Sequence, residues 1–179
     1  FIKGQDTLGL GNINESKVTN NLVVYSDKKI VGYQGRFTHA GKVELNMRRH
    51  LTIGDVLRFS TGFSSVMETF LHYLDDEGVE DFIEHIDEYA TDPQKLHQKY
   101  PDFFGKEKDA SATKTIMAIR KRLRPLIDEG KGLHANNSNL LEDTFAYLKQ
   151  GKTVIIDLSL KDSRDANIIS TIMVRNLFE

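Results

Sequence analysis

The apolar residues of this chain change their spacing along its length, and each spacing predicts a different element. The β-branched run Val154–Ile156 predicts a strand that is buried on both faces, because a strand with one exposed face would alternate apolar and polar residues. Asp157–Ser159 ends this strand. A helix follows, which we expect Ser163 to cap. At about 100° per residue its apolar side chains cover most of the circumference, so it should pack on more than one side. A buried strand that is followed by such a helix is typical of a parallel α/β sheet.

The first fifty residues predict short extended segments. Residues 1–20 are rich in Gly, Asn, Thr and Ser, which is typical of a loop. Leu22–Tyr25 predicts a strand, and Ser26–Lys29 predicts a turn. Ile30–Tyr33 and Lys42–Met47 predict two further short extended pieces.

From residue 51 the apolar residues recur every three or four positions, which predicts helices. The pair Ser65 and Glu68 has the spacing of a capping box, and we expect Gly78 to end the helix that it begins. Asp92-Pro93 predicts the cap and first turn of a later helix.

The longest helix should run from about Ser111 towards Glu129, with a kink or a break just before Pro125. An amphipathic helix over Leu140–Leu148 then leads to Gly151. The expected fold is therefore α/β, with part of a parallel sheet and a large helical insertion. Residues 1–50 supply loops and short strands, residues 51–132 the insertion, and residues 133–179 a helix, a strand and a helix.

Composition adds limits to this picture. The 39% of hydrophobic residues suffices for one domain with a real core. No apolar run is long enough for a transmembrane helix, so we expect no membrane partner. The absence of cysteine excludes disulfides and thiol chemistry and suits a reducing cytoplasm. Because the chain starts at Phe1 and its last predicted helix ends at Glu179 without a polar tail, we expect it to be an interior piece of a longer protein, or a processed one.

Charge is unevenly distributed although the net charge is only −2. Asp75–Asp92 holds nine acidic residues and no Lys or Arg, whereas Ser111–Pro125 holds five basic residues and no acidic one. Four of these basic residues fall on one side of the predicted helix: Lys114, Arg120, Lys121 and Arg124. One interpretation is a face that contacts phosphates, indifferent to base sequence. The other is a solvated face, or one that pairs with acidic helices within the fold or across a subunit boundary.

Familiar catalytic motifs are incomplete in this sequence. Gly151-Lys152-Thr153 matches the end of a phosphate-binding loop, but Ala146 stands where that loop needs its first glycine. The tripeptide also precedes a strand instead of opening a helix, so we interpret it as a loop. The six histidines lack the HExxH spacing, and no G-x-S-x-G motif occurs, so we expect neither a metal site nor a nucleophile elbow.

Three stretches resemble HerA-type ATPases of the HerA–FtsK superfamily. They are the strand and helix VIIDLS…RNLFE, the segment GKVELNMRRHLTIGDVLRFSTGFSSVMETFLHYL, and ATKTIMAIRKRLRPLIDEGKGL. The resemblance covers about residues 21–179. It implies a RecA-like, hexameric, ATP-driven translocase that acts on DNA and is often partnered with a nuclease.

The resemblance also implies roles for two acidic residues. Asp27 stands where such ATPases end a strand in Asp, and Asp157 ends the later strand. Both are therefore candidates for positions next to a nucleotide. The alternatives are an ordinary turn aspartate at position 27 and a strand-end cap at position 157. The chain lacks the phosphate-binding loop and the acidic Walker B strand, so ATP and magnesium would bind elsewhere in the parent protein. A different interpretation is a helical module for protein interaction or ring assembly that binds no nucleic acid.

Overall fold

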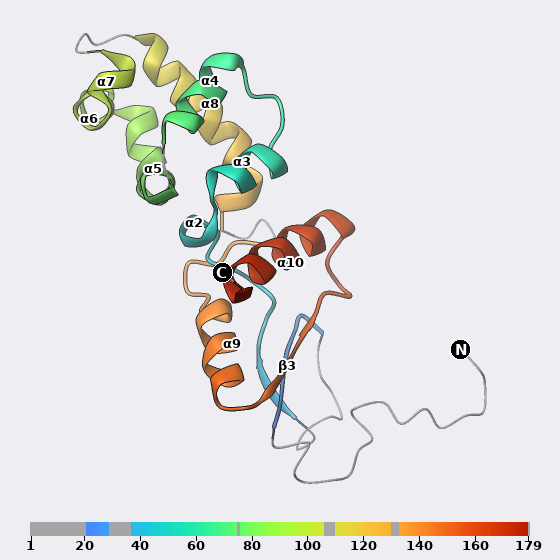
Figure 1. The fold of residues 1–179 in the computed structure, drawn as a ribbon. Coiled ribbons are helices and arrows are strands. Elements are labelled where there is room, and N and C mark those ends of the chain that lie inside the picture. Colours follow the sequence, from blue (N-terminus) through green and yellow to red (C-terminus); the bar gives the residue numbers. More distant parts are fainter. Residues whose placement is uncertain (1–20, 29–36, 75, 106–109, 130–132, 179) are drawn as a thin grey trace. The chain divides into compact units, whose positions relative to one another are not determined.

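The computed structural model describes residues 21–28, 37–74, 76–105, 110–129 and 133–178 (Figure 1). Within them the chain forms two compact units. We call the described parts of Phe1–Glu44 and Asn139–Glu179 the α/β unit, and those of Leu45–Ser138 the helical unit. In the sequence, the helical unit is inserted between the second and third strands. The expected fold class, α/β with a parallel sheet and a large helical insertion, is confirmed.

The sheet of the α/β unit has three parallel strands in the order β2-β1-β3. They are β1 (Leu22–Ser26), β2 (Thr38–Gly41) and β3 (Thr153–Asp157). β1 is central and buried, with Val23 fully enclosed. It pairs with β3 in an unbroken register from Leu22↔Thr153 to Ser26↔Asp157. The extended piece predicted at Lys42–Met47 forms no strand, since β2 ends at Gly41 and α2 begins at Met47, but Leu45 within it makes an isolated parallel β-bridge to His134. The piece predicted at Ile30–Tyr33 lies outside the described residues.

The prediction that β3 is buried on both faces is also wrong for the described part of the chain. Every residue from Val154 to Asp157 is only half-buried, because β3 lies at an edge of this sheet. The strand enclosed on both sides is β1, whose sequence Leu-Val-Val-Tyr-Ser is no more apolar than that of β3.

Two helices complete the α/β unit, namely α9 (Leu140–Lys149), which packs against β3, and α10 (Ser163–Phe178). Asp162, not Ser163, caps α10, since its Oδ1 accepts the backbone N–H of Asp165 at 2.8 Å. Among the described residues α10 buries one face only. Phe178 and Val174 remain 84% and 56% exposed, which contradicts packing on more than one side.

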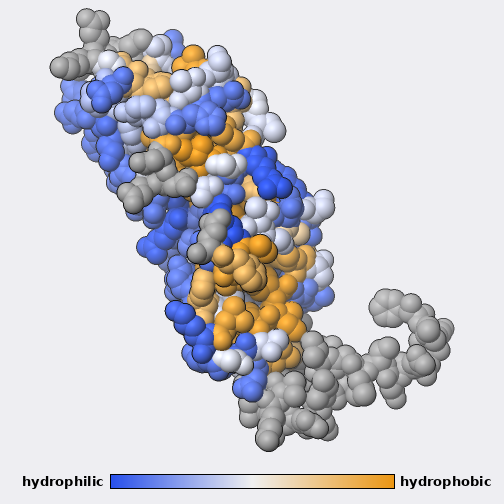
Figure 2. Space-filling view, in the orientation of Figure 1, coloured by the Kyte–Doolittle hydropathy of each residue, from blue (hydrophilic) through white to orange (hydrophobic). Residues whose placement is uncertain are grey.

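Figure 2 shows an apolar area over the visible face of the α/β unit. Within the parts of the chain that the structure describes, no helix is both long enough and apolar enough to cross a bilayer.

The helical unit consists of seven helices in its described residues. Their bounds are α2 Met47–His50, α3 Ile53–Phe59, α4 Ser65–Tyr73, α5 Asp76–Thr91, α6 Pro93–Lys99, α7 Pro101–Phe104 and α8 Ala110–Ile127. α5 and α8 pack along each other. Phe70 lies at the centre of an aromatic cluster, with its ring 5.0 to 6.4 Å from those of Tyr73, Phe82, Tyr100, Phe103 and Phe104. Such aromatic packing stabilises a core beyond simple burial.

Several helix boundaries differ from the expectation. Ser64, not Ser65, caps α4, because its hydroxyl accepts the N–H of Met67. Gly78 lies inside α5 instead of ending a helix. The cap at Asp92 is confirmed: its Oδ1 accepts the amides of Gln94 and Lys95. α8 continues through Pro125 to Ile127, so no break occurs there.

The chain enters and leaves the helical unit through two segments that are bonded to each other. Leu45 N–H donates to Leu133 O at 2.9 Å, and Ala135 N–H donates to Leu45 O at 3.0 Å. Met47 N–H donates to His134 Nδ1 at 3.1 Å. These bonds hold the two ends of the helical unit side by side.

Candidate functional site

The carboxyl edge of the sheet carries the two acidic residues that the sequence singled out. Ser26 ends β1 opposite Asp157, which ends β3, and Asp27 directly follows β1. Because the strands are parallel, these side chains belong to one edge. In open α/β sheets ligands bind outside the carboxyl ends of the strands, so this edge is the first place to look for a site.

Asp157 is held by several donors. Its Oδ2 accepts the Ser26 hydroxyl at 2.9 Å and lies 3.3 Å from Lys28 Nζ, while its Oδ1 accepts the Ser159 amide at 3.0 Å. Hydrogen bonding by the Ser159 side chain, opposed in part by burial and assisted by the other donors, lowers the pKa of Asp157 to about 2. The carboxylate is therefore charged at neutral pH and joins the ends of two strands.

Asp27 is tied in a similar way. Its Oδ1 accepts the backbone N–H of Val43 at 3.1 Å, and its Oδ2 lies 2.9 Å from Nζ of Lys161, whose side chain is only 10% exposed. Each carboxylate thus has its own lysine. This arrangement positions the loops at the sheet edge and neutralises both carboxylates, so neither is free to act as a general base or to take a metal ion alone.

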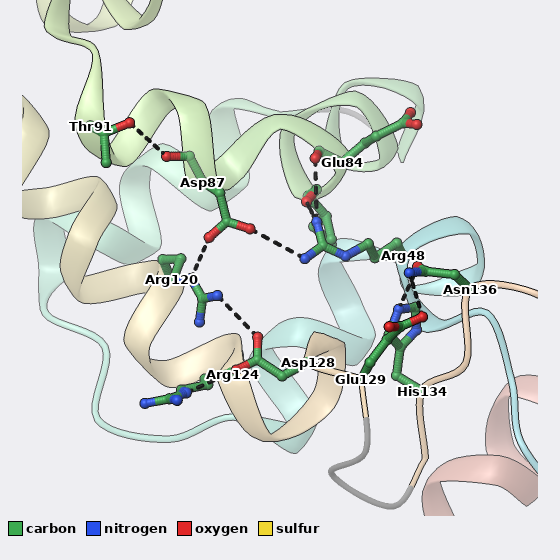
Figure 3. Close-up of polar contacts among 11 residues, drawn as sticks. Arg48, Glu84, Asp87, Thr91, Arg120, Arg124, Asp128, Glu129, His134 and Asn136 are labelled. Carbon is green, nitrogen blue, oxygen red and sulfur yellow. Dashed lines mark hydrogen bonds and ion pairs between the residues drawn. The ribbon is translucent and has the colours of Figure 1, made fainter.

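The four basic residues predicted to form one face of α8 fall into two pairs. Arg120 and Arg124 belong to a network of ion pairs with Asp87 of α5 and with Asp128 (Figure 3). Arg120 Nε lies 2.7 Å from Asp87 Oδ1 and its Nη2 lies 3.0 Å from Asp128 Oδ1, while Arg124 Nε lies 2.8 Å from Asp128 Oδ2. These two arginines are therefore paired inside the helical unit.

Lys114 and Lys121 differ from them. Both are exposed, and no ion pair to either is found among the described residues. They are seven residues apart, which places them on one face of α8 at about 10 Å along its axis. Arg122 lies elsewhere on the helix and donates to the carbonyl oxygens of Gly62 and Ala118.

A polar cleft of about 610 Å³ lies beside this network, and sequence reasoning missed it (Figure 3). Its lining residues are Arg48, Glu84, Arg124, Ile127, Asp128, Glu129, His134 and Asn136. Arg48 is bound from one side: its Nη1 donates to Ile83 O at 2.9 Å and its Nη2 lies 3.4 Å from Asp87 Oδ2. In the sequence, Arg48, Arg49 and His50 stand next to one another, but nothing in this run indicates which residues surround Arg48.

His134 is the buried titratable group of this cleft. Its Nδ1 accepts the Met47 amide, so Nε2 carries the proton and donates to Asn136 Oδ1 at 2.9 Å. Burial is the main cause that lowers the pKa of His134. The imidazole is thus neutral in the folded protein at neutral pH. Among the described residues, no group of three or more His, Cys, Asp and Glu side chains is arranged to hold a metal ion.

Comparison of the chain with protein-family models, with curated proteins and with solved structures gives no match.

Proposed function

We propose that this chain is part of an ATP-driven DNA translocase of HerA type, in which it contributes structure and DNA contacts but no catalytic residues. The observation that carries the proposal is the placement of Asp27 and Asp157 at one carboxyl edge of a parallel sheet, where α/β proteins bind nucleotides. Since both carboxylates are paired with lysines, they would support loops around a nucleotide instead of touching its metal ion.

In this proposal ATP and magnesium bind to parts of the parent protein other than this chain, which lacks the phosphate-binding loop. The parent would act as a hexameric ring with a nuclease partner, in the cytoplasm. The chain by itself would not hydrolyse ATP.

DNA would contact Lys114 and Lys121. These two ammonium groups are exposed and have no carboxylate partner in the described residues, whereas Arg120 and Arg124 already have partners. Contacts to phosphates alone carry no base information, so binding should not depend on DNA sequence.

Fluorescence anisotropy with two labelled duplexes of unrelated sequence, measured over a salt series, tests this proposal. We expect both duplexes to bind equally, with a Kd in the range of about 10⁻⁶ to 10⁻⁴ M that rises steeply with salt. Lys114→Gln/Lys121→Gln should weaken binding and reduce the slope of log K against log salt by about 1.8, since each lost phosphate contact removes about 0.9.

The matched control is Lys95→Gln/Lys99→Gln. It changes the net charge equally, but it removes lysines of α6 that pair with Glu88 and Asp81. If the control weakens binding as much as the α8 variant, net charge and not the α8 face governs the affinity.

The second candidate function is a module for ring assembly or protein interaction that binds no DNA. Val174 and Phe178 favour it, because they are exposed one turn apart on α10 and so form one apolar patch, and contiguous exposed apolar patches mark contact surfaces. Absence of DNA binding by the unaltered chain at low salt would favour this candidate over the first.

A further inference from the structure

The junction at which the chain enters and leaves the helical unit contains a buried histidine. Leu45 on the entering segment forms an isolated parallel β-bridge with His134 on the leaving segment. His134 is only 4% exposed. None of the sequence motifs accounts for an imidazole at this position, and its hydrogen bonds indicate what it can do.

The neutral ring of His134 supplies one of the acceptors that the junction needs. Leu45 O accepts the N–H of Ala135 at 3.0 Å and that of Met47 at 2.9 Å. His134 Nδ1 accepts the same Met47 N–H at 3.1 Å. The two backbone donors are therefore shared between a carbonyl oxygen and an imidazole nitrogen, and both donors are satisfied.

Protonation of His134 removes this balance. An imidazolium ring has two N–H donors and no acceptor. Since Nε2 already donates to Asn136 Oδ1, the additional proton is placed on Nδ1, which faces the Met47 N–H. Three N–H groups would then compete for Leu45 O, whose carbonyl has two lone pairs. A buried donor without an acceptor destabilises the state that contains it, so the protonated ring disfavours the closed junction.

The charged side chains around His134 act in both directions. They line the polar cleft from α2, α5, α8 and the residues after α8: Arg48, Glu84, Arg124, Asp128 and Glu129. Burial lowers the pKa of His134 and outweighs the hydrogen bond to Asn136 and the charge of Glu129, which raise it. The Arg48 guanidinium acts in the same direction as burial. The closed junction therefore prefers the neutral ring.

We propose that His134 is a pH-dependent latch of this junction. The neutral ring holds the start of α2 against the segment that leaves the helical unit, and protonation opens this contact while the longer helices stay folded. The opening is local because Arg48 Nη1 donates to Ile83 O at 2.9 Å, a bond between α2 and α5 that does not involve the imidazole. It begins as pH falls below about 6.5, the ordinary pKa of histidine.

Amide hydrogen exchange of the full chain at about pH 7 and about pH 5, measured by NMR and corrected for the intrinsic exchange rate, tests the latch. The protection factor of the Met47 amide should fall by about tenfold, because opening is coupled to protonation of His134. Phe82 and Ile116 are fully buried in α5 and α8, and their amides should stay at least about tenfold more protected than Met47 at pH 5. An unchanged Met47 protection factor would overturn the proposal. Equal protection of the three amides at pH 5 would also overturn it, because the chain would then open only by global unfolding.

Two variants assign the pH dependence to one ring. His134→Gln keeps a donor and an acceptor but does not titrate, so Met47 protection should differ by less than about twofold between the two pH values. The matched control is His97→Gln. His97 is also buried, at 7% exposure, but its Nδ1 donates to Gly105 O at 3.0 Å, and a proton on its other nitrogen leaves that bond in place. The control variant should therefore retain the fall at Met47. Persistence of the fall in His134→Gln, or its loss in His97→Gln, would contradict the latch.

The ¹⁵N chemical shifts of the His134 ring test the same mechanism in the unaltered chain. At pH 7 the proton should be on Nε2, with Nδ1 unprotonated, because Nδ1 accepts the Met47 N–H. Both nitrogens should become protonated over the pH range in which Met47 loses protection. A proton on Nδ1 at pH 7, or protonation of the ring without loss of Met47 protection, would overturn the proposal.

Discussion

Asp128 connects two arginines of α8, and its replacement by asparagine should lower the stability of the chain measurably. Asn has the same shape but carries no charge, so Asp128→Asn weakens the bonds to Arg120 at 3.0 Å and to Arg124 at 2.8 Å without creating a cavity. Burial opposes the charged form, but hydrogen bonding by Arg124 and Arg120 prevails and lowers the pKa of Asp128.

The size of the stability loss in Asp128→Asn depends on how exposed the paired side chains are. Fully exposed ion pairs contribute about 0.2–1 kcal/mol, whereas breaking a buried pair costs about 3–5 kcal/mol. The side chains of Asp128 and Arg120 are 16% and 25% exposed, and that of Arg124 is 60% exposed. One partly buried pair and one exposed pair together give a loss of about 1.5–2 kcal/mol. At about 2–4 °C per kcal/mol for a chain of this size, Tm should fall by about 3–8 °C.

Urea denaturation followed by circular dichroism measures this loss, and a double-mutant cycle with Arg120→Gln isolates the pair. The coupling between Arg120 and Asp128 should persist at about 0.5 M salt, because partly buried charges are screened less than exposed ones. The matched control is the exposed pair Lys95–Glu88, whose coupling should vanish at that salt concentration. A loss below about 0.5 kcal/mol in Asp128→Asn would refute the view that this network stabilises the helical unit.

Two further predictions concern pH. His134 has a folded-state pKa below the unfolded value of about 6.5, so its contribution to stability is full above that pH and is lost as pH falls through 6.5 towards the folded pKa. His134→Gln should reduce the change of the urea midpoint with pH between about pH 5 and 7. An unchanged pH dependence would contradict the lowered pKa of His134. The pKa of Asp157 is lowered to about 2, so its contribution to stability is full above about pH 4 and is lost as pH falls from about 4 to about 2. Asp157→Asn should lower the free energy of unfolding at pH 7 by about 1 kcal/mol, a value reduced for solvent screening because the side chain is 25% exposed. An acid-unfolding midpoint that is the same in the variant would refute this contribution.

The sequence was most informative where a structure depends on neighbouring residues. The cap at Asp92 followed by Pro93 is local chemistry, and it lies where expected. The strand at residues 154–156 was also predicted correctly, but it was expected to be buried on both faces and instead lies at an edge of the sheet. Strand order depends on pairing between distant segments, and Leu22–Ser26 is as suitable for the central position as the later strand.

The same distinction applies to the candidate sites. The sequence named Asp27 and Asp157 as separate candidates, and it is the parallel pairing of β1 with β3 that places both at one edge. Their lysine partners depend on how the loops fold back, which one sequence does not specify. Helical periodicity grouped four basic residues of α8, and one of the two interpretations of that face, pairing with an acidic helix within the fold, is confirmed for Arg120. That its partner is Asp87 is shown only by the structure. The polar cleft brings together residues as distant in the chain as Arg48 and Asn136, beyond the reach of any local pattern.

The bonds that join Leu45 to Leu133 and Ala135 have a consequence for how this protein can vary. The inserted segment starts and finishes at adjacent points. The distance between its two ends therefore stays short, as in a tight turn, whatever the length of the insertion. Closing a longer loop costs little additional entropy, about 0.6 kcal/mol for each doubling. Helices can therefore be gained, lost or exchanged above this junction while the register of the sheet stays the same, so the helical unit is the part of the chain best suited to acquire new partners.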